Sequence, residues 1–342
     1  MRSVSFFFGF AQKETTSFFR IFPPEISSHM ALKSLNTLNT LGIKFIQEKK
    51  DNYETELFGI NFKNKLGLAA GLDKNGDYIN ALGNLGFSFI ELGTVTPRPQ
   101  RGNKKPRLFR DQKNLSLLNR MGFNNKGVEY LVSKLKKVET HSNYNIAISI
   151  GKNFDTPNER AIDDYLFCLE KAYPVTHFVT VNISSPNTKD LRHLQSPKEL
   201  PNFLSALKEK QYSLSKEFGY KPLLVKISPD EDQKEHLKKI SNILISLEID
   251  GIIATNTSVD HKHKKGEGGI SGALLFKKST KVLSIMRENL GTDFPIIASG
   301  GVTDIETYWE KINSGADLVQ IYTGMIYRGP QIIEEILNSI EQ

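Results

Sequence analysis

The sequence has one cysteine, one tryptophan and no long hydrophobic run. A single cysteine excludes an intramolecular disulfide and a metal site built from cysteines, and it favours a reducing compartment. Cys168, beside Leu166 and Phe167 in a helix-like stretch, is interpreted as a small core residue rather than a nucleophile. No segment holds 18 apolar residues without a charge, and the apolar run in residues 1–11 is too short to span a bilayer. We therefore expect a chain that does not cross a membrane, although it could lie on one.

Neither sign of charge dominates the chain. Lys and Arg number 45 against 38 Asp and Glu, which gives a formal net charge of +7, and acids are interleaved with the bases. The densest basic segment, residues 98–110, is a single loop. A basic balance alone reflects solubility and non-specific attraction to anions, so no nucleic-acid partner is predicted.

Short apolar segments alternate with longer helical patterns from residue 66 onward. The apolar segments show little internal alternation, which is typical of strands buried on both faces. Eight strand-then-helix units predict an α/β fold closed into a (β/α)8 TIM barrel, with an open doubly wound sheet as the alternative. Strands are expected at residues 66–70, 88–94, 145–150, 178–182, 222–227, 251–255, 295–299 and 317–322. Helices are expected at residues 75–85, 126–138, 158–172, 197–217, 231–247, 276–288, 304–314 and 330–339.

The residues before the first strand have a different pattern. Pro24 can begin a helix and Gly42 can end one, and apolar residues between them recur at helical spacing. Residues 53–64 then predict a short β-hairpin at the lower end of the barrel. We therefore expect an N-terminal extension of residues 1–47 with one or two amphipathic helices, followed by a barrel of residues 48–342.

Glycines follow the last three predicted strands, at the end of a barrel where active sites lie. Gly300–Gly301 and Thr323–Gly324 follow strands seven and eight, where barrels often bind phosphate through backbone N–H groups. Gly268–Gly272 adds unhindered backbone after strand six. Any one pair could serve only a tight turn, but the three together predict a phosphate site.

Lys226 lies in the apolar strand LLVKI, where an unpaired ammonium would be costly. It should therefore face an anion or an electron-rich group. Flavin mononucleotide (FMN) would satisfy these constraints, with its phosphate at strands seven and eight, its ring across the barrel mouth and a lysine beside the reduced ring.

Four asparagines, Asn119, Asn182, Asn187 and Asn256, follow separate rim segments. Each amide offers a donor and an acceptor, so together they could bind a planar ligand with alternating N–H and C=O groups, such as a pyrimidine. The alternative role for any single asparagine is a structural one, in a turn or as a helix cap.

Six motifs occur in order: AAGLDKNG, NRMGFNN, VNISSPNT, ATNTS, GGISG and LVQIYTG. From about Pro24 to the C-terminus the chain closely resembles the dihydroorotate dehydrogenases of class 2, which are membrane-associated and use quinone. The resemblance implies an FMN enzyme that oxidises (S)-dihydroorotate to orotate in pyrimidine (UMP) biosynthesis. It also implies a monomer in peripheral contact with a membrane, at the cytoplasmic face of a bacterial inner membrane or, in a eukaryote, at the mitochondrial inner membrane.

The motif match also implies roles for individual residues. Ser185 would be the catalytic base, removing a proton from substrate C5 while hydride leaves C6 for the flavin. FMN contacts would come from Ala70, Gly71, Thr94, Asn182, Lys226, Thr255, Gly272, Gly301, Tyr322 and Thr323. Substrate contacts would come from Lys74, Asn119, Arg120, Met121, Gly122, Phe123, Asn182, Asn187, Asn256 and Thr257. His29 and Arg110 match positions that line a quinone tunnel, and no metal ion is implied.

The chain departs from the family pattern at Ser149, where many relatives have an asparagine that touches FMN. The shorter hydroxyl predicts a bridging water or a small flavin shift, with weaker flavin binding. No histidine or aspartate in the VNISSPNT motif would activate Ser185, so a water chain is the expected proton relay. The alternatives are a tRNA dihydrouridine synthase, which should have a cysteine acid and an RNA-binding domain, and a barrel that only binds a nucleotide.

Overall fold

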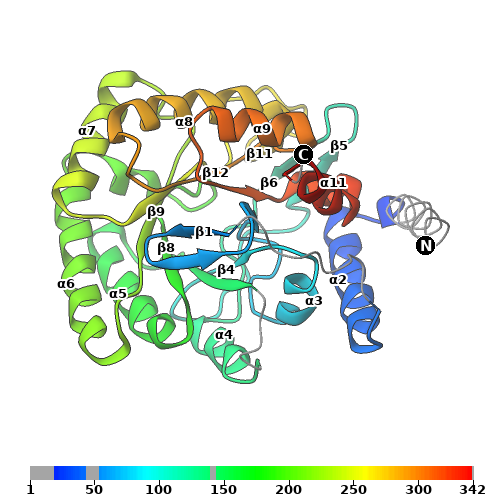
Figure 1. Cartoon of the computed structure of the whole chain (residues 1–342), viewed down its shortest axis with the longest axis horizontal. Helices are drawn as coiled ribbons and strands as arrows, with labels where there is room; N and C mark the ends of the chain where they lie inside the picture. The colour runs from blue at the N-terminus through cyan, green and yellow to red at the C-terminus, as the bar shows by residue number, and fades with distance from the viewer. Residues whose placement is uncertain (1–18, 44–53, 139–143, 341–342) are drawn as a thin grey trace.

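The computed structural model describes residues 19–43, 54–138 and 144–340. Eight parallel strands close into a barrel in which β3 pairs with both β4 and β13 (Figure 1). The predicted closed barrel is confirmed, and the open doubly wound sheet is excluded. The barrel strands are β3 (Leu66–Leu68), β4 (Phe89–Val95), β7 (Asn145–Ile150), β8 (Phe178–Asn182), β9 (Leu223–Ile227), β10 (Gly251–Ala254), β12 (Ile296–Ser299) and β13 (Leu318–Ile321).

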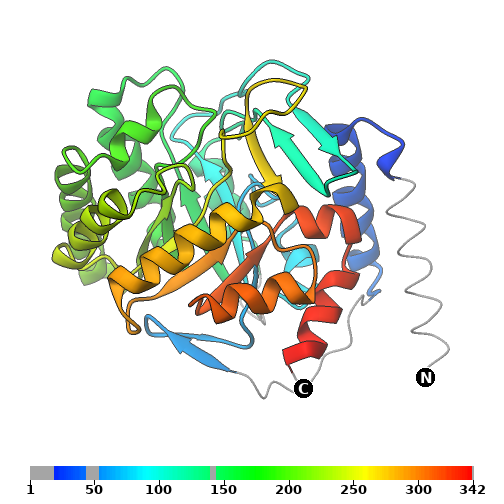
Figure 2. The ribbon, with the colours of Figure 1, turned by 90° about the horizontal axis from the view of Figure 1, so that it is seen from above.

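Helices surround the barrel and cover the outer face of the sheet (Figures 1 and 2). Their apolar faces join the strands in one large core, which includes Cys168 as predicted. They are α3 (Ile79–Gly83), α4 (Val128–Leu135), α5 (Ala161–Ala172), α6 (Leu200–Phe218), α7 (Lys234–Ser246), α8 (Phe276–Leu290), α9 (Ile305–Asn313), α10 (Thr323–Arg328) and α11 (Gln331–Ile340). The short α10 was not predicted.

The first helix of the barrel is shorter than the sequence predicted. The Asp73 carboxylate accepts hydrogen bonds from the backbone N–H groups of Asn75 (3.2 Å), Asp77 (3.0 Å) and Tyr78 (2.7 Å). These bonds hold residues 73–78 in a turn, because an aspartate that binds nearby N–H groups competes with helix formation. The predicted helix at residues 75–85 is therefore wrong in its first turn.

The predicted hairpin is confirmed as β1 (Thr55–Leu57) and β2 (Ile60–Phe62). Phe62 packs edge-on against Phe89 with ring centroids 5.6 Å apart, and Phe178 lies 6.4 Å from Phe62. Phe89 and Phe178 are the first residues of their strands. The hairpin therefore closes the amino-terminal end of the barrel, opposite the antiparallel sheet described next (Figure 2).

A three-stranded antiparallel sheet stands over the carboxyl-terminal end of the barrel and was not predicted. Its strands are β5 (Leu108–Asp111), β6 (Ser116–Asn119) and β11 (Gly269–Gly272), in the order β11–β6–β5. Gly269 pairs with Asn119 and Gly272 with Ser116. The glycine-rich segment interpreted as a loop is therefore a strand, and its partner lies far away in the sequence.

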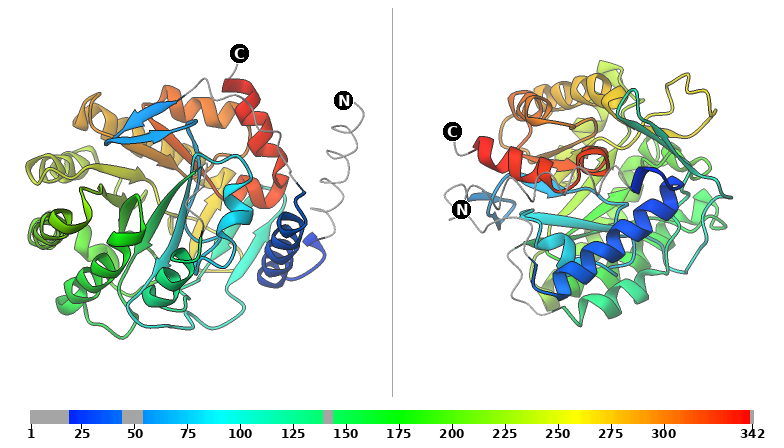
Figure 3. Two further views of the ribbon diagram at one scale, coloured as in Figure 1. Left: turned by 60° about the horizontal axis from the view of Figure 1, so that its bottom comes forward. Right: turned by 90° about the vertical axis from the view of Figure 1, so that its right-hand side faces the viewer.

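Helix α2 (Pro24–Thr40) is the predicted amphipathic helix. It packs on the outside of the barrel against α3, near β5 and the C-terminal helices (Figure 3). Glu25 fixes its first turn to the rim through an ion pair of 2.7 Å with Arg107. Within the described ranges, no helix has the length and apolarity needed to cross a membrane. Residues 1–18 and 44–47 of the predicted extension lie outside the described residues.

Candidate active site

A cavity opens at the carboxyl ends of the barrel strands, with an empty volume of about 1070 Å³ that includes its open mouth. We call it the polar cavity because hydrogen-bonding side chains from several rim loops line it. Its wall is formed by residues in or directly after seven of the barrel strands, namely β3, β4, β8, β9, β10, β12 and β13. Ser185 lines it. The predicted flavin residues that line it are Ala70, Gly71, Thr94, Asn182, Lys226, Thr255, Gly272, Gly301, Tyr322 and Thr323. The predicted substrate residues that line it are Lys74, Asn119, Met121, Gly122, Phe123, Asn182, Asn187, Asn256 and Thr257.

Two of the predicted flavin and substrate residues lie outside the cavity wall. Ser149 is fully buried behind Thr94, and their hydroxyl oxygens are 2.9 Å apart. The Arg120 guanidinium points away from the cavity, donates to the carbonyl oxygens of Lys265 and Glu267, and stacks on Phe109 at 5.2 Å. Ser149 can therefore act on a ligand only through Thr94, and Arg120 holds the 260–268 loop.

Lys226 reaches the cavity floor, where it meets a carboxylate. Its Nζ lies 3.2 Å from Glu91 Oε2, which also accepts bonds from Gln320 Nε2 (2.9 Å) and the Ala70 N–H (3.2 Å). Glu91 Oε1 and Gln320 Oε1 are buried and find no hydrogen-bond partner among the described residues. Sequence reasoning missed Glu91 and Gln320, although a charged and an amide side chain inside the apolar strands FIELGTV and LVQI were the available signal.

The structure brings the four asparagines together in two pairs, each joined by a hydrogen bond between its two side chains. Asn187 Nδ2 donates to Asn119 Oδ1 (2.9 Å), and Asn256 Nδ2 donates to Asn182 Oδ1 (3.1 Å). Asn182 Nδ2 donates in turn to Thr94 Oγ1 (2.8 Å). Mutual hydrogen bonds hold the amides in place around the cavity, which is the preorganisation that recognition of a planar polar ligand requires.

The two serines of the strand-four motif differ in their contacts. Ser184 Oγ is fully buried and accepts a bond from Asn256 Nδ2 (3.0 Å), so it helps to build the wall. Ser185 lines the cavity, and its Oγ accepts a weak bond from the Asn187 N–H (3.3 Å). No histidine or carboxylate hydrogen-bonds to Ser185 Oγ in the part of the chain that the structure describes. Ser185 is thus free to face a ligand.

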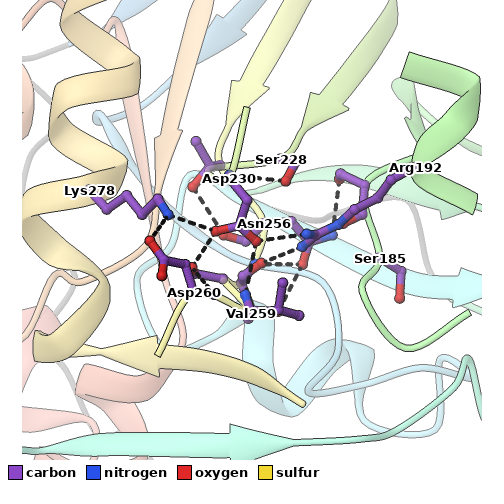
Figure 4. A network of polar contacts seen from close by, with 12 residues as sticks. Ser185, Arg192, Ser228, Asp230, Asn256, Val259, Asp260 and Lys278 are labelled. Carbon is purple, nitrogen blue, oxygen red and sulfur yellow. Dashed lines mark hydrogen bonds and ion pairs between the residues drawn. The ribbon is translucent and has the colours of Figure 1, made fainter. Parts of the chain in front are cut away.

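Arg192 joins three rim loops beside Ser185 (Figure 4). Its guanidinium donates to the Ser184 carbonyl (3.2 Å), to Asp230 Oδ2 (2.7 Å) and to the Thr257 carbonyl (3.0 Å). One side chain therefore fixes the loops after β8, β9 and β10 relative to one another. The sequence alone gave no reason to select Arg192.

Asp230 accepts further hydrogen bonds on both of its carboxylate oxygens (Figure 4). Ser258 Oγ donates to it, as do the Val259 N–H (2.9 Å) and Lys278 Nζ (3.0 Å). Burial alone would raise the pKa of the Asp230 carboxyl, but these donors and Arg192 together lower it. Asp230 therefore stays ionised and anchors Arg192.

Lys74 extends from the loop after β3 into the cavity, and its Nζ donates to the Gly71 carbonyl (2.5 Å). The pKa of Lys74 is lowered to about 8, chiefly by burial and also by the nearby Arg107, while Glu25 and Asp73 oppose the shift. An ammonium group with few partners in such a wall is suited to bind an anionic group of a ligand.

The loop after β12 approaches other backbone so closely that glycine is required. Gly301 has φ +90°, and a Cβ there would lie 2.4 Å from Phe276 Cα. Gly272, with φ +82°, would place a Cβ 2.2 Å from the Leu115 carbonyl oxygen. The predicted phosphate-binding glycines thus bring backbone from separate elements together at one end of the cavity.

A second, largely apolar cavity with an empty volume of about 1360 Å³ lies beneath α2. Leu108, Leu117 and Tyr322 line both cavities and so form the wall between them. Arg110 lines the second cavity and donates to the carbonyls of Arg20 (3.0 Å) and Phe22 (2.8 Å). Burial lowers the pKa of Arg110.

The structure does not bring His29 into this cavity. Ser28, Ala31, Leu32 and Leu35 line it from one face of α2, as their helical spacing requires. His29, the residue after Ser28, does not belong to this face, and its side chain is exposed. Ser28 therefore occupies the place at which His29 was predicted.

Comparisons with known proteins agree with this arrangement. A family model described as dihydroorotate dehydrogenase matches residues 52–342. Dihydroorotate dehydrogenase (quinone) from Nitrosospira multiformis is 47% identical over 320 residues, covering 92% of this chain and 91% of the relative. The relative of that name from Aliivibrio salmonicida is 49% identical over 303 residues, covering 86% and 89%. A crystal structure of DHODH in complex with ferulenol from Eimeria tenella has a TM-score of 0.83 and 32% identity, covering 91% and 90%. The chain therefore belongs to the dihydroorotate dehydrogenase family, in its quinone-dependent class 2.

Proposed function

We propose that this chain oxidises (S)-dihydroorotate to orotate in pyrimidine biosynthesis, with FMN in the polar cavity and a membrane quinone as the final oxidant. The observation that carries the proposal is the pair of cavities separated by Leu108, Leu117 and Tyr322. The first cavity has hydrogen-bonding groups for a polar substrate. The second is apolar and opens beneath a surface helix, as a quinone would require.

The chain's own residues fit FMN. Gly301 and Gly272 bring backbone to the end of the cavity where a phosphate would be held. The unpartnered, buried oxygen of Gln320 fits a ligand that donates N–H groups. Lys226 presents a buried positive charge to the same space. When bound, FMN supplies the acceptor for a hydride from substrate C6.

The remaining residues would bind the substrate and move its proton. Lys74 would bind the substrate carboxylate, and the asparagine pairs would bind the amide groups of its ring. Ser185 would accept the proton from C5 as the hydride leaves C6, which oxidises the C5–C6 single bond to a double bond. Because no acid or base partner contacts Ser185 among the described residues, the proton is expected to leave through water.

Helix α2 supports a peripheral contact with a membrane. Ile26 on this helix is 53% exposed, and Ile21 before it and Leu41 directly after it are 79% and 69% exposed. These apolar side chains lie on the segment that covers the second cavity and would enter the lipid interface. We propose a monomer bound to the cytoplasmic face of a bacterial inner membrane, or to the mitochondrial inner membrane in a eukaryote.

The alternative functions have less support. The chain's one cysteine, Cys168, is buried in α5 and does not line the polar cavity, so it is not placed to be the acid of a dihydrouridine synthase. A barrel that only binds a nucleotide would not be reduced by dihydroorotate. The purified protein should be yellow and lose its flavin absorbance when dihydroorotate is added without oxygen. Reoxidation of the reduced flavin by a ubiquinone analogue, but not by fumarate or NAD⁺, would identify quinone as the final oxidant.

A further inference from the structure

Lys311 on α9 is a fully buried lysine that the proposed reaction does not use. Its Nζ donates to Ser279 Oγ (2.7 Å) and lies 5.1 Å from the centre of the Phe276 ring. No carboxylate forms an ion pair with Lys311 within the described ranges. Burying an ammonium without a counter-charge is unfavourable, so a group that is not part of the chain is expected to balance it.

The contacts of Lys311 connect it to one end of the polar cavity. Ser279 Oγ, which accepts the bond from Lys311, lies 2.8 Å from the Gly300 carbonyl oxygen and donates to it. Gly300 and Gly301 both line the cavity. Gly301 also packs so tightly on Phe276 that no Cβ would fit between them. Lys311 therefore supports, from behind, the loop that shapes this end of the cavity.

We propose that Lys311 is a positioning residue for a phosphate monoester held at the Gly300–Gly301 loop, acting through its positive charge and through Ser279. The inference rests on the proposed binding of FMN, whose phosphate is the anion concerned. A phosphate monoester carries about −1.5 to −2 charges at neutral pH. A positive charge behind the loop attracts it without direct contact, and more strongly than in water because the intervening protein excludes solvent.

The titration of Lys311 agrees with this role. Burial lowers the pKa of Lys311 to about 7, and the nearby Glu310 opposes the shift. Without a ligand, the charged form of Lys311 is thus destabilised by the loss of its hydration. An anion at the adjacent loop would favour the charged form.

The test compares FMN with riboflavin, which has the same ring and lacks the phosphate. Apoprotein would be titrated with each flavin by fluorescence quenching, for the wild type, Lys311→Met and a control, Lys277→Met. Lys277 is exposed at the start of α8, the helix that carries Ser279, so its variant removes an equal charge at the surface. Lys311→Met should raise the Kd for FMN about tenfold, equivalent to ~1.4 kcal/mol, and leave the Kd for riboflavin unchanged. Lys277→Met should change neither.

The outcomes separate this inference from the proposed function. Equal weakening of FMN and riboflavin by Lys311→Met, or no weakening of either, would overturn the role of Lys311. Wild-type protein that binds no FMN would instead contradict the proposed cofactor. Thermal unfolding of the apoprotein checks the fold, and Lys311→Met should be at least as stable as wild type because it no longer buries a charge. If that variant does not fold, Ser279→Ala must produce the same selective loss of FMN affinity, and unchanged affinity would reject the inference.

Discussion

Lys226 Nζ lies 3.2 Å from Glu91 Oε2 inside the barrel, and the two side chains are 6% and 0% exposed. The pair joins β9 to β4 across the cavity floor, with Gln320 and the Ala70 N–H on the same carboxylate oxygen. The Glu91 carboxylate thus fixes the position of the Lys226 ammonium at the cavity wall. The charge proposed to face the flavin is therefore built into the barrel core.

Glu91→Gln should lower the free energy of unfolding of the apoprotein by about 3 kcal/mol, because breaking a buried pair leaves Lys226 without a counter-charge. Urea unfolding measures this change. Glu306→Gln, at an exposed position on α9, is the control and should change stability by less than about 0.5 kcal/mol. The double variant Glu91→Gln, Lys226→Met should recover part of the loss, whereas strictly additive effects would contradict direct coupling.

The pH dependence of kcat/KM for dihydroorotate should show the titration of Lys74. Below a pH of about 8 the ammonium is charged and can bind an anionic substrate, and above it the group loses its proton, so kcat/KM should fall. Lys74→Met should lower kcat/KM by about tenfold to a hundredfold, the value of one hydrogen bond to a charged group. A descending limb that persists unchanged in Lys74→Met would assign the titration to another residue.

Arg192→Met should slow reduction of the bound flavin by up to about a hundredfold, since misplacement of a reacting group by about 1 Å can have that effect. The variant loses the link between the loops after β8, β9 and β10, while the flavin contacts remain. Stopped-flow reduction, normalised to flavin content, measures the change. Arg98→Met, which removes an exposed ion pair with Asp155, is the control and should leave the rate unchanged. If Arg192→Met loses flavin instead, the residue stabilises the fold rather than the loop that carries Ser185.

Ala31→Phe should place a ring in the apolar cavity beneath α2. We expect the KM for a soluble ubiquinone analogue to rise about tenfold or more, because burying a large side chain there competes with the quinone. Reduction of the flavin by dihydroorotate should not change, since that half-reaction takes place in the other cavity. Lys33→Phe, on the exposed face of α2, is the matched control.

His29 provides a separate test of the same cavity. A selective rise in the KM for quinone in His29→Ala would show that this exposed side chain reaches the site in the working enzyme. An unchanged KM would agree with its position in the structure, where Ser28 lines the cavity instead.

The sequence predicted the barrel because short, mostly apolar strand segments alternate with longer segments whose apolar residues recur at helical spacing. β7 (Asn145–Ile150) and β8 (Phe178–Asn182) match the predicted bounds, and an asparagine marks one end of the apolar run in each strand. The cavity-lining asparagines and glycines were also predictable, because the fold places every loop after a strand at one rim. Local pattern and barrel topology were sufficient for these features.

Features that depend on distant pairings were not predictable in this way. β11 forms because Gly269–Gly272 pairs with Ser116–Asn119, a contact that no local period encodes. The role of Arg192 depends on two backbone carbonyls and the Asp230 carboxylate, which belong to three different loops. Its own neighbours in sequence carry no signal of these contacts. His29 lies one residue away from the face of α2 that lines the apolar cavity, because helix orientation is set by packing against the barrel rather than by composition.

Anaerobic stopped-flow reduction of the bound flavin by dihydroorotate, compared between wild type and Ser185→Ala, tests whether Ser185 accepts the substrate proton. Ser185 faces the cavity, and removing its hydroxyl removes the proposed proton acceptor without disturbing Ser184 or the asparagine pairs. We expect the flavin content to stay unchanged and the rate of reduction to fall by about a hundredfold or more, the scale of general base catalysis. An unchanged rate of reduction in Ser185→Ala would contradict this role of Ser185.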